Sequence, residues 1–502
     1  MTMLVDSNDR NGCREPWPTA TAPGKGAPMT RCIMVALDGL RPDMVSPALT
    51  PHLAALAAAG TRFAHARSVF PSETRVATPS LVTGCRPGGH GMVANTVFDA
   101  SVAPDRLLRT KLVADVQAMA QGGESPLQRP TLAERLAPQG RSFALVSSGT
   151  HGAATLLHPA AERLGQFRWN VEDAGGATAD MVRAKLGPTP PAGVPNTARV
   201  EFAGRVLLDH VLPRLRPDVA LLWLSEPDIA FHYLGLGHAQ TLAALRAADA
   251  VLGRVVAWRD AQPDARDIGI VVLSDHGHVT GYGKRSLREE LCRAGFRAGE
   301  GMGPETDIVV APAAAPGLWL RDLSLAGQVA DWLAAQGWAG PLLARDPAFL
   351  PEGRALPLAL LGSAHVRSAD LVVTFAGSEG PDGWGLPGTA PFDAPDVPEG
   401  GGMHGGLHRA ELATVLVMQG GPFRAGAVAQ EPADLTDIVP TVMHALGLPA
   451  EGMEGRALRA AFEAAADAPP LREMVDLPGG FVLEAMRAAP GGRFYPTALR
   501  RG

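Results

Sequence analysis

Short apolar segments alternate along the chain with segments of helical periodicity. Strands buried on both faces are predicted at residues 32–37, 143–146, 219–224 and 268–273, where apolar and β-branched residues dominate. Apolar residues at helical spacing follow at 240–258. Because strands that alternate with helices form βαβ units, the pattern predicts an α/β fold with a large, mostly parallel central sheet.

Local signals predict further elements. Thr50 and Pro51 mark the start of a helix and Gly60 marks its end, since these residue types are favoured at those positions. Further strands are expected at 370–375 and 410–418, and a last helix near 434–446.

The same pattern suggests how the chain is divided. Residues 1–28 are polar and rich in Pro, Thr and Gly, and we expect them to be a disordered leader or an over-extended start. The main domain is expected at 29–460, with residues 461–502 as a C-terminal extension. Two segments are predicted to be insertions that form a cap or loop region. Residues 100–130 lack a clear strand, and residues 340–402 are rich in Pro and Gly.

Charge and composition exclude several classes of protein. Lys and Arg number 45 and Asp and Glu 51, which gives a formal charge of −6, whereas a nucleic-acid-binding surface needs a basic face. No apolar run approaches the roughly 18 residues of a membrane-spanning helix. The scattered cysteines exclude a disulfide scaffold and a thiolate zinc finger. We therefore expect neither a nucleic-acid nor a membrane partner, and the sequence does not reveal the oligomeric state.

The first thirty residues contain no basic start followed by an apolar stretch. We expect a cytoplasmic location, and a periplasmic one if the start of the chain differs.

Side chains of metal-ligand type follow the predicted strands. Because the carboxyl ends of parallel strands meet at one edge of a sheet, these side chains should lie close together. Three carboxylates and three imidazoles are enough for two metal ions with mixed oxygen and nitrogen ligands, a set that suits zinc. The candidates are Asp38, Asp228, His232, Asp275, His276 and His404.

Two metal ions roughly 4 Å apart hold the attacking and departing oxygens of an in-line displacement at phosphorus. One of them also lowers the pKa of a bound hydroxyl, which makes a serine or threonine usable as a nucleophile. The segment 68–75 (SVFPSETR), followed by 81–84 (LVTG), supplies such hydroxyls. These residues favour hydrolysis at phosphorus.

The order and spacing of these motifs resemble the type I phosphodiesterase/nucleotide pyrophosphatase branch of the alkaline phosphatase superfamily, from about residue 30 to 455. The matching motifs are Asp38-Gly39, VFPSET ending at Thr74, LVTG ending at Gly84, Glu226-Pro227-Asp228 with His232, Asp275-His276-Gly277, and His404-Gly405 through Gly421-Pro422. The resemblance implies an alkaline-phosphatase-like three-layer sandwich with cap insertions. It also implies a hydrolase that cleaves phosphodiester or pyrophosphate bonds.

The resemblance further implies the roles of individual residues. One zinc would be held by Asp38, Thr74, Asp275 and His276, and the other by Asp228, His232 and His404. Manganese or iron could replace zinc. Thr74 would attack phosphorus and form a phospho-threonine that water then hydrolyses. Asn95 would donate a hydrogen bond to a phosphoryl oxygen; the alternative is that it is only a turn residue before a strand.

The chain departs from the family pattern after the nucleophile. The family usually continues Thr-x-Pro-Asn-His, whereas this chain reads TRVAT from Thr74. If Arg75 turns inward, its planar fork could pair with a second anionic group on the substrate; if it turns outward, it is a solvated charge. Aromatic residues make up only 5%, and no slot for a nucleobase is evident. We expect a small anionic phosphorus-containing substrate, and the alternative is a phosphonate hydrolase of the phosphonoacetate or phosphonate monoester type.

Other readings of the chain remain open. His408 could approach the substrate, His238 and His278 would orient ligands or begin helices, and His444 would be a core residue. A sulfatase is less favoured because no Cys/Ser-x-Pro-x-Arg motif occupies the nucleophile segment. A phosphoglycerate mutase would need serine in place of Thr74, and a non-catalytic relative would have lost at least one of the ligand positions.

Overall fold

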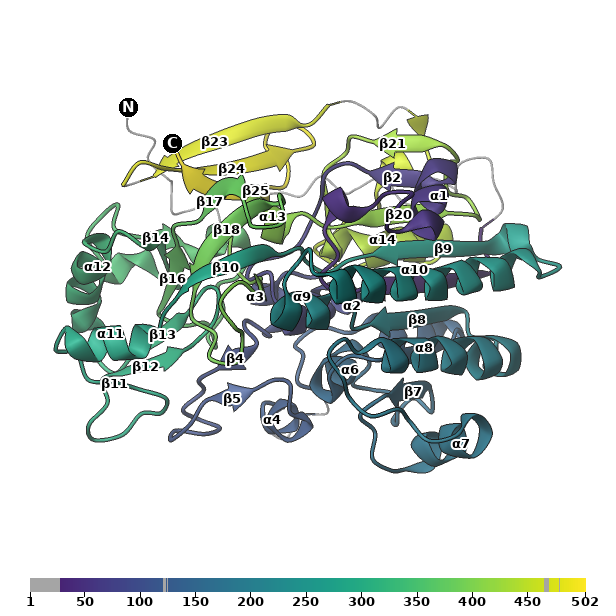
Figure 1. Ribbon diagram of the computed structural model, residues 1–502, viewed down its shortest axis with the longest axis horizontal. Coiled ribbons are helices and arrows are strands. Elements are labelled where there is room, and N and C mark those ends of the chain that lie inside the picture. Colours follow the sequence, from purple (N-terminus) through teal and green to yellow (C-terminus); the bar gives the residue numbers. More distant parts are fainter. Residues whose placement is uncertain (1–27, 121–122, 124, 465–468, 478) are drawn as a thin grey trace.

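A large mixed sheet forms the centre of the computed structural model, which describes residues 28–120, 123, 125–464, 469–477 and 479–502 (Figure 1). Its strands lie in the order β21 (Ala427–Ala429), β2 (Thr61–Phe63), β20 (Leu416–Gln419), β9 (Ile268–Leu273), β1 (Arg31–Leu37), β8 (Val219–Leu224), β6 (Phe143–Ser147) and β7 (Phe167–Asn170). The strands from β9 to β7 are parallel, and β20 is antiparallel to β9. The predicted α/β fold with a mostly parallel sheet is confirmed. The predicted leader at 1–28 lies outside the described residues except for residue 28.

Helices cover both faces of this sheet because its strands are apolar on both sides. Along β1, Met34 and Ala36 pack into one core, while Val35 and Leu37 pack into the other. The first core is covered by α2 (Thr74–Thr83), α5 (Leu132–Leu136), α6 (His151–Leu157) and α14 (Leu435–Ala445). The second is covered by α1 (Pro51–Ala59), α8 (Thr197–Val206) and α10 (Ala239–Asp260), and Figure 1 shows α8 and α10 side by side.

A second sheet with its own apolar core lies beside the central one. Its strands are β11 (Ala298–Gly299), β12 (Ile308–Ala311), β13 (Gly317–Leu320), β16 (Leu371–Phe375), β14 (Ala339–Ala344) and β15 (Leu356–Pro357), accompanied by α11 (Leu287–Arg293) and α12 (Ala326–Ala334). A smaller sheet contains β17 (Ser378–Pro381), β18 (Pro387–Phe392), β10 (Val279–Lys284) and β19 (Gly402–Met403).

One strand was expected in the segment 340–402, and the structure has several. The missed strands are short and contain Gly and Pro, which lower strand propensity, so their pairing depends on partners distant in the chain. The segment 100–130 holds the short helix α4 (Val113–Ala118) and β5 (Leu108–Arg109), which pairs with β4 (Thr96–Val97).

The predicted strand at 410–418 is wrong in its first half. The chain forms one turn of helix, α13 (Arg409–Leu412), before β20 begins at Leu416. A capping box causes the turn: His408 accepts a backbone N–H of the helix, and Glu411 accepts the backbone N–H of His408. The apolar residues of 410–418 by themselves had indicated a strand over the whole segment.

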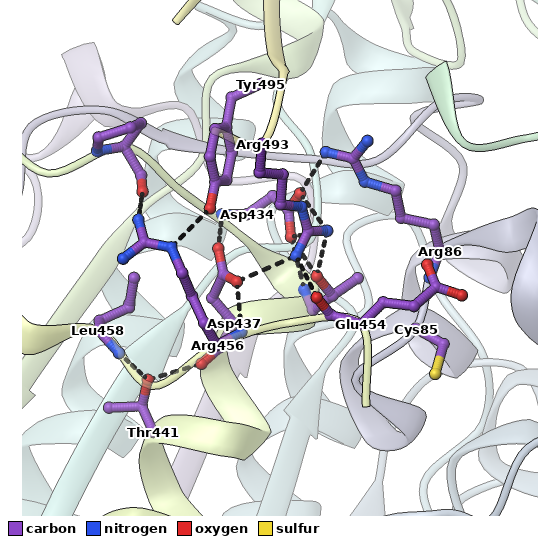
Figure 2. Close-up of polar contacts among 12 residues, drawn as sticks. Cys85, Arg86, Asp434, Asp437, Thr441, Glu454, Arg456, Leu458, Arg493 and Tyr495 are labelled. Atoms are coloured by element: carbon purple, nitrogen blue, oxygen red, sulfur yellow. Dashed lines mark hydrogen bonds and ion pairs between the residues drawn. The ribbon is translucent and has the colours of Figure 1, made fainter. Parts of the chain in front are cut away.

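The C-terminal residues form an antiparallel sheet of β23 (Leu471–Leu477), β24 (Phe481–Arg487) and β25 (Tyr495–Arg501). An ionic network joins this sheet to the start of α14, where Arg493 lies between Asp434 and Asp437 (Figure 2). The backbone N–H of Leu499 donates to the carbonyl of Leu407 at 2.8 Å, three residues after His404. The extension therefore supports the loop that carries a predicted ligand.

The other short elements connect these layers. They are β3 (Ala66–Arg67), β22 (Ala433–Asp434), α3 (Pro87–His90), α7 (Ala177–Leu186) and α9 (Asp228–Leu234). Within the described part of the chain, no helix combines the length and apolarity that crossing a bilayer requires.

Candidate metal centre and active site

Three adjacent parallel strands bring carboxylates to one edge of the central sheet. Asp38 directly follows β1, Asp228 follows β8 as the first residue of α9, and Asp275 follows β9. Because β1 lies between β8 and β9, these side chains meet at the carboxyl end of the sheet. The helix α9 places His232 one turn after Asp228 on the same face. His404 enters from the loop after β19.

One group of side chains surrounds a carboxylate oxygen of Asp228. Its Oδ1 lies 3.3 Å from Nε2 of His232, 3.5 Å from Nε2 of His404 and 3.1 Å from Nε2 of His278. The Nε2 atoms of His232 and His404 are 3.2 Å apart. These four residues each offer one ligand atom within 4.8 Å of the others. His278 was expected only to orient ligands or to begin a helix, although its place two residues after His276 was a signal.

A second group surrounds Nε2 of His276. That atom lies 3.1 Å from Oγ1 of Thr74, 3.4 Å from Oδ1 of Asp38 and 3.3 Å from Oδ2 of Asp275. Ligand atoms of Asp38, Asp228 and His276 also lie within 4.8 Å of one another, so the two groups adjoin. The structure thus brings all seven predicted ligand positions together.

The imidazole rings present the same nitrogen to the centre. In each ring Nδ1 contacts a backbone carbonyl and Nε2 faces the carboxylates. The carbonyl partners are Gly402 for His232 (2.6 Å), Gly277 for His276 (3.1 Å), Gly39 for His278 (3.1 Å) and Ser72 for His404 (2.8 Å). A neutral ring that donates through Nδ1–H keeps a lone pair on Nε2, which is the arrangement of a metal-binding histidine.

Buried acceptor atoms face one another at this centre. Oδ1 of Asp38, Oδ1 of Asp228 and Oδ2 of Asp275 make no hydrogen bond within the described residues. Burial and the neighbouring carboxylates of Asp275 and Asp228 raise the pKa of Asp38 well above its usual range. Unpaired buried carboxylates are costly unless a cation compensates them, so the donor set fits divalent metal ions.

Two further groups hold the carboxylates in place. The indole Nε1–H of Trp223 donates to Oδ2 of Asp38 at 2.9 Å, and the backbone N–H of Gly39 donates to Oδ1 of Asp275 at 3.0 Å. Each carboxylate therefore turns its other oxygen toward the imidazoles. Trp223 lies inside a predicted strand, and no local signal distinguished it from a core residue.

Thr74 is the first residue of α2, and the residue is only 7% exposed. Helix N-termini carry unpaired N–H groups and the positive end of the helix dipole, which favour a negative group beside Thr74. The hydroxyl of Thr74 lies at hydrogen-bond distance from His276, so the predicted nucleophile faces the second ligand group.

Asn95 lies beside the start of this helix. Its Oδ1 accepts the backbone N–H of Arg75 at 3.0 Å, and its own backbone N–H donates to the buried carboxylate of Glu73. With Oδ1 engaged, the amide Nδ2 is the group that can donate to a bound ligand. Glu73, which anchors Asn95, was not among the residues expected at the site.

Arg75 is half-buried and turns inward. Its Nε donates to Oγ1 of Thr110 at 3.2 Å, and its Nη atoms make no hydrogen bond within the described residues. Burial lowers the pKa of Arg75, while Glu73 and the carboxylates of the site, Asp38 among them, oppose the shift. A positive charge thus accompanies the carboxylate cluster.

The remaining histidines lie outside both ligand groups. His408 caps α13 through Nδ1, and its Nε2 lies 3.2 Å from the carbonyl of Ser378, so both ring nitrogens are engaged. His238 caps α10. His444 is half-buried, with its ring edge-on to Phe462 at 4.9 Å, rather than fully in the core as predicted.

Fold and site together define an α/β protein with a carboxylate–imidazole centre that could hold metal at the ends of parallel strands. The sequence profile of the type I phosphodiesterase/nucleotide pyrophosphatase family matches residues 32–293, just over half of the chain. The chain belongs to this family.

Individual relatives are distant. The venom phosphodiesterase of Macrovipera lebetinus is 26% identical over 249 residues, which cover 49% of this chain and 25% of the relative. Ectonucleotide pyrophosphatase/phosphodiesterase family member 1 of Rattus norvegicus is 25% identical over 262 residues, covering 50% of this chain and 24% of the relative. The matched part of the chain spans about a quarter of the length of these curated relatives.

Among solved structures, murine ectonucleotide pyrophosphatase/phosphodiesterase 5 shares the fold. The inactive threonine-to-alanine variant of that protein, in complex with AMP, superposes with a TM-score of 0.60 at 16% identity. The match covers 86% of this chain and 100% of that one.

Proposed function

We propose that this chain is a metal-dependent phosphoric ester hydrolase that cleaves phosphodiester or pyrophosphate bonds, with Thr74 as its nucleophile. The observation that carries the proposal is the position of Thr74 Oγ1, 3.1 Å from His276 Nε2 and next to two adjoining ligand groups. In the similar murine protein, the variant in which a threonine is replaced by alanine is inactive and is in complex with AMP, which supports the same assignment.

Two zinc ions fit the donor set, and manganese or iron could take the same ligands. One ion would be held by Asp38, Thr74, Asp275 and His276, and the other by Asp228, His232 and His404. Bound metal would supply positive charge that lowers the pKa of the Thr74 hydroxyl and stabilises charge on the phosphoryl group.

The chain's own residues then account for the chemistry. Thr74 Oγ1 forms a bond to phosphorus while the bond from phosphorus to the leaving oxygen breaks, and water later releases the phosphoryl group from the threonine. Asn95 Nδ2–H donates to a non-bridging oxygen, where negative charge develops. The N-terminus of α2 favours the same negative charge.

Arg75 favours a substrate that carries a second negative group. Arg75 follows Thr74 in the chain, and its Nη atoms make no hydrogen bond within the described residues. A planar fork pairs well with a carboxylate or a phosphate. A pyrophosphate bond and a phosphonate with a carboxylate both offer such a group. Phosphonate hydrolysis at the same site is therefore the second candidate function.

The test uses zinc-loaded protein with bis-p-nitrophenyl phosphate and p-nitrophenyl phosphate, compared with the Thr74→Ala variant. We expect a higher rate on the diester, lowered at least about a thousandfold in the variant. Activity that survives Thr74→Ala would contradict the assignment of the nucleophile.

A second comparison uses the Arg75→Met variant to test the substrate class. Loss of activity should be larger for a nucleoside diphosphate or phosphonoacetate than for the singly charged diester. Equal losses on all three substrates would contradict the role of Arg75.

A further inference from the structure

His278 is placed at the distance of a metal ligand rather than at the edge of the site. Ligand atoms of a tetrahedral zinc ion with bonds of about 2.0–2.1 Å are about 3.3 Å apart. The distances from Asp228 Oδ1 to the nitrogens of His232, His404 and His278 are 3.3, 3.5 and 3.1 Å. The distance between the nitrogens of His232 and His404 is 3.2 Å. The ligand atom of His278 also lies within 4.8 Å of those of His232 and His404, so it is close enough to share one ion with them.

The surrounding chain is shaped around the ring of His278. The ring is fully buried and packs edge-on against Phe231 at 4.9 Å. Gly39 has φ +73°, and a Cβ atom there would lie 2.4 Å from Cε1 of His278. A side chain at Gly39 would therefore collide with this ring, and glycine both permits the backbone conformation and leaves room for it.

The hydrogen bonding of His278 leaves its Nε2 atom without a donor or acceptor partner within the described residues. Its Nδ1 lies 3.1 Å from the carbonyl of Gly39, which can only accept, so the ring donates there. Nε2 then carries a lone pair that faces Asp228 Oδ1, and neither atom has a hydrogen-bond partner within the described residues. Two buried acceptors in contact are costly, and a metal cation between them would remove that cost.

We propose that His278 is the fourth protein ligand of the metal ion held by Asp228, His232 and His404. This inference rests on the proposed metal centre. Four protein ligands would fill a tetrahedral coordination sphere and would hold that ion more tightly than three. His278 would thus strengthen metal binding at the group around Asp228.

The test measures metal binding directly and needs no substrate. Zinc affinity is determined by competition with a chelator for the full chain and for His278→Ala, with His238→Ala as the matched control, because His238 caps a nearby helix outside the cluster. We expect the tighter of two sites to weaken about 10–100-fold in His278→Ala. His238→Ala should leave it unchanged.

Cobalt replacement reports the ligand number. The absorption of four-coordinate cobalt should weaken in His278→Ala, and added imidazole should restore both the spectrum and the affinity. His278→Gln separates a ligand from a hydrogen-bond donor, since glutamine can still donate to Asp228. Zinc affinity retained in His278→Gln, or an unchanged cobalt spectrum in His278→Ala, would overturn the proposal.

The outcomes also separate this inference from the proposed function. A chain that binds two metal ions with His278-dependent affinity but hydrolyses none of the esters would contradict the function and support the ligand. A chain that hydrolyses the diester but binds metal equally well with and without His278 would support the function and contradict the ligand.

Discussion

Replacing Arg493 by methionine is expected to loosen the C-terminal sheet from the main domain. Arg493 donates to Asp434 at 3.0 Å, to Asp437 at 3.2 Å and to Thr436 Oγ1 at 2.6 Å (Figure 2). The two carboxylates are 4% and 0% exposed, so water cannot replace the lost contacts. Methionine keeps much of the side-chain volume while it removes the charge.

The size of the destabilisation depends on which contacts of Asp434 and Asp437 remain after Arg493 is replaced. Removing one partner of a buried ion pair costs about 3–5 kcal/mol. Arg86 still contacts Asp434 at 3.2 Å, and the backbone N–H of Arg456 still donates to Asp437 at 2.9 Å. We therefore expect the lower end, about 3 kcal/mol, which corresponds to an increase of roughly 100-fold in the opening equilibrium of the sheet.

Hydrogen exchange measured by mass spectrometry is the appropriate assay, because the sheet can open without global unfolding. Backbone amides in peptides of β24 should exchange roughly 100-fold faster in the variant. These peptides report on opening because Leu483 and Ala485 bury their side chains against the main domain. Arg487→Met is the control: Arg487 pairs with Glu473 inside the same sheet, at partly exposed positions, and should cost about 1 kcal/mol or less. Equal loss of protection in both variants would refute the role of the buried network.

Two further predictions concern the site and its support. Trp223→Phe removes the indole donor to Asp38 and should weaken zinc binding about 10–100-fold, as measured by chelator competition. The melting temperature of the metal-free chain should fall as well, because Trp223 is fully buried and the smaller ring leaves a cavity; unchanged zinc affinity would contradict the supporting role. Burial raises the pKa of Glu411 from its ordinary value of 4.5 to about 7. The folded chain therefore keeps a proton that the unfolded chain releases, so this group's contribution to the unfolding free energy falls as pH rises from about 4.5 to 7. Urea unfolding across this range should show a flatter dependence in Glu411→Gln, and an identical slope would refute the raised pKa.

Local sequence determined the strands and the ligands that directly follow them. The apolar segments that end before Asp38 and Asp275 are long enough to be buried, and a parallel sheet brings their carboxyl ends together whatever surrounds it. Asp228 and His232 were predictable for the same reason, because helical spacing alone places them on one face.

Only the tertiary structure decided which atoms meet around those ligands. Trp223 reaches Asp38 across neighbouring strands, and the room for His278 depends on the backbone of Gly39, far away in the chain. The short strands that contain Gly and Pro, and the ionic contacts of Arg493, likewise depend on partners distant in sequence. Their stability comes from packing and from charge compensation between segments that only the folded chain brings together, so no local pattern of residues encodes them.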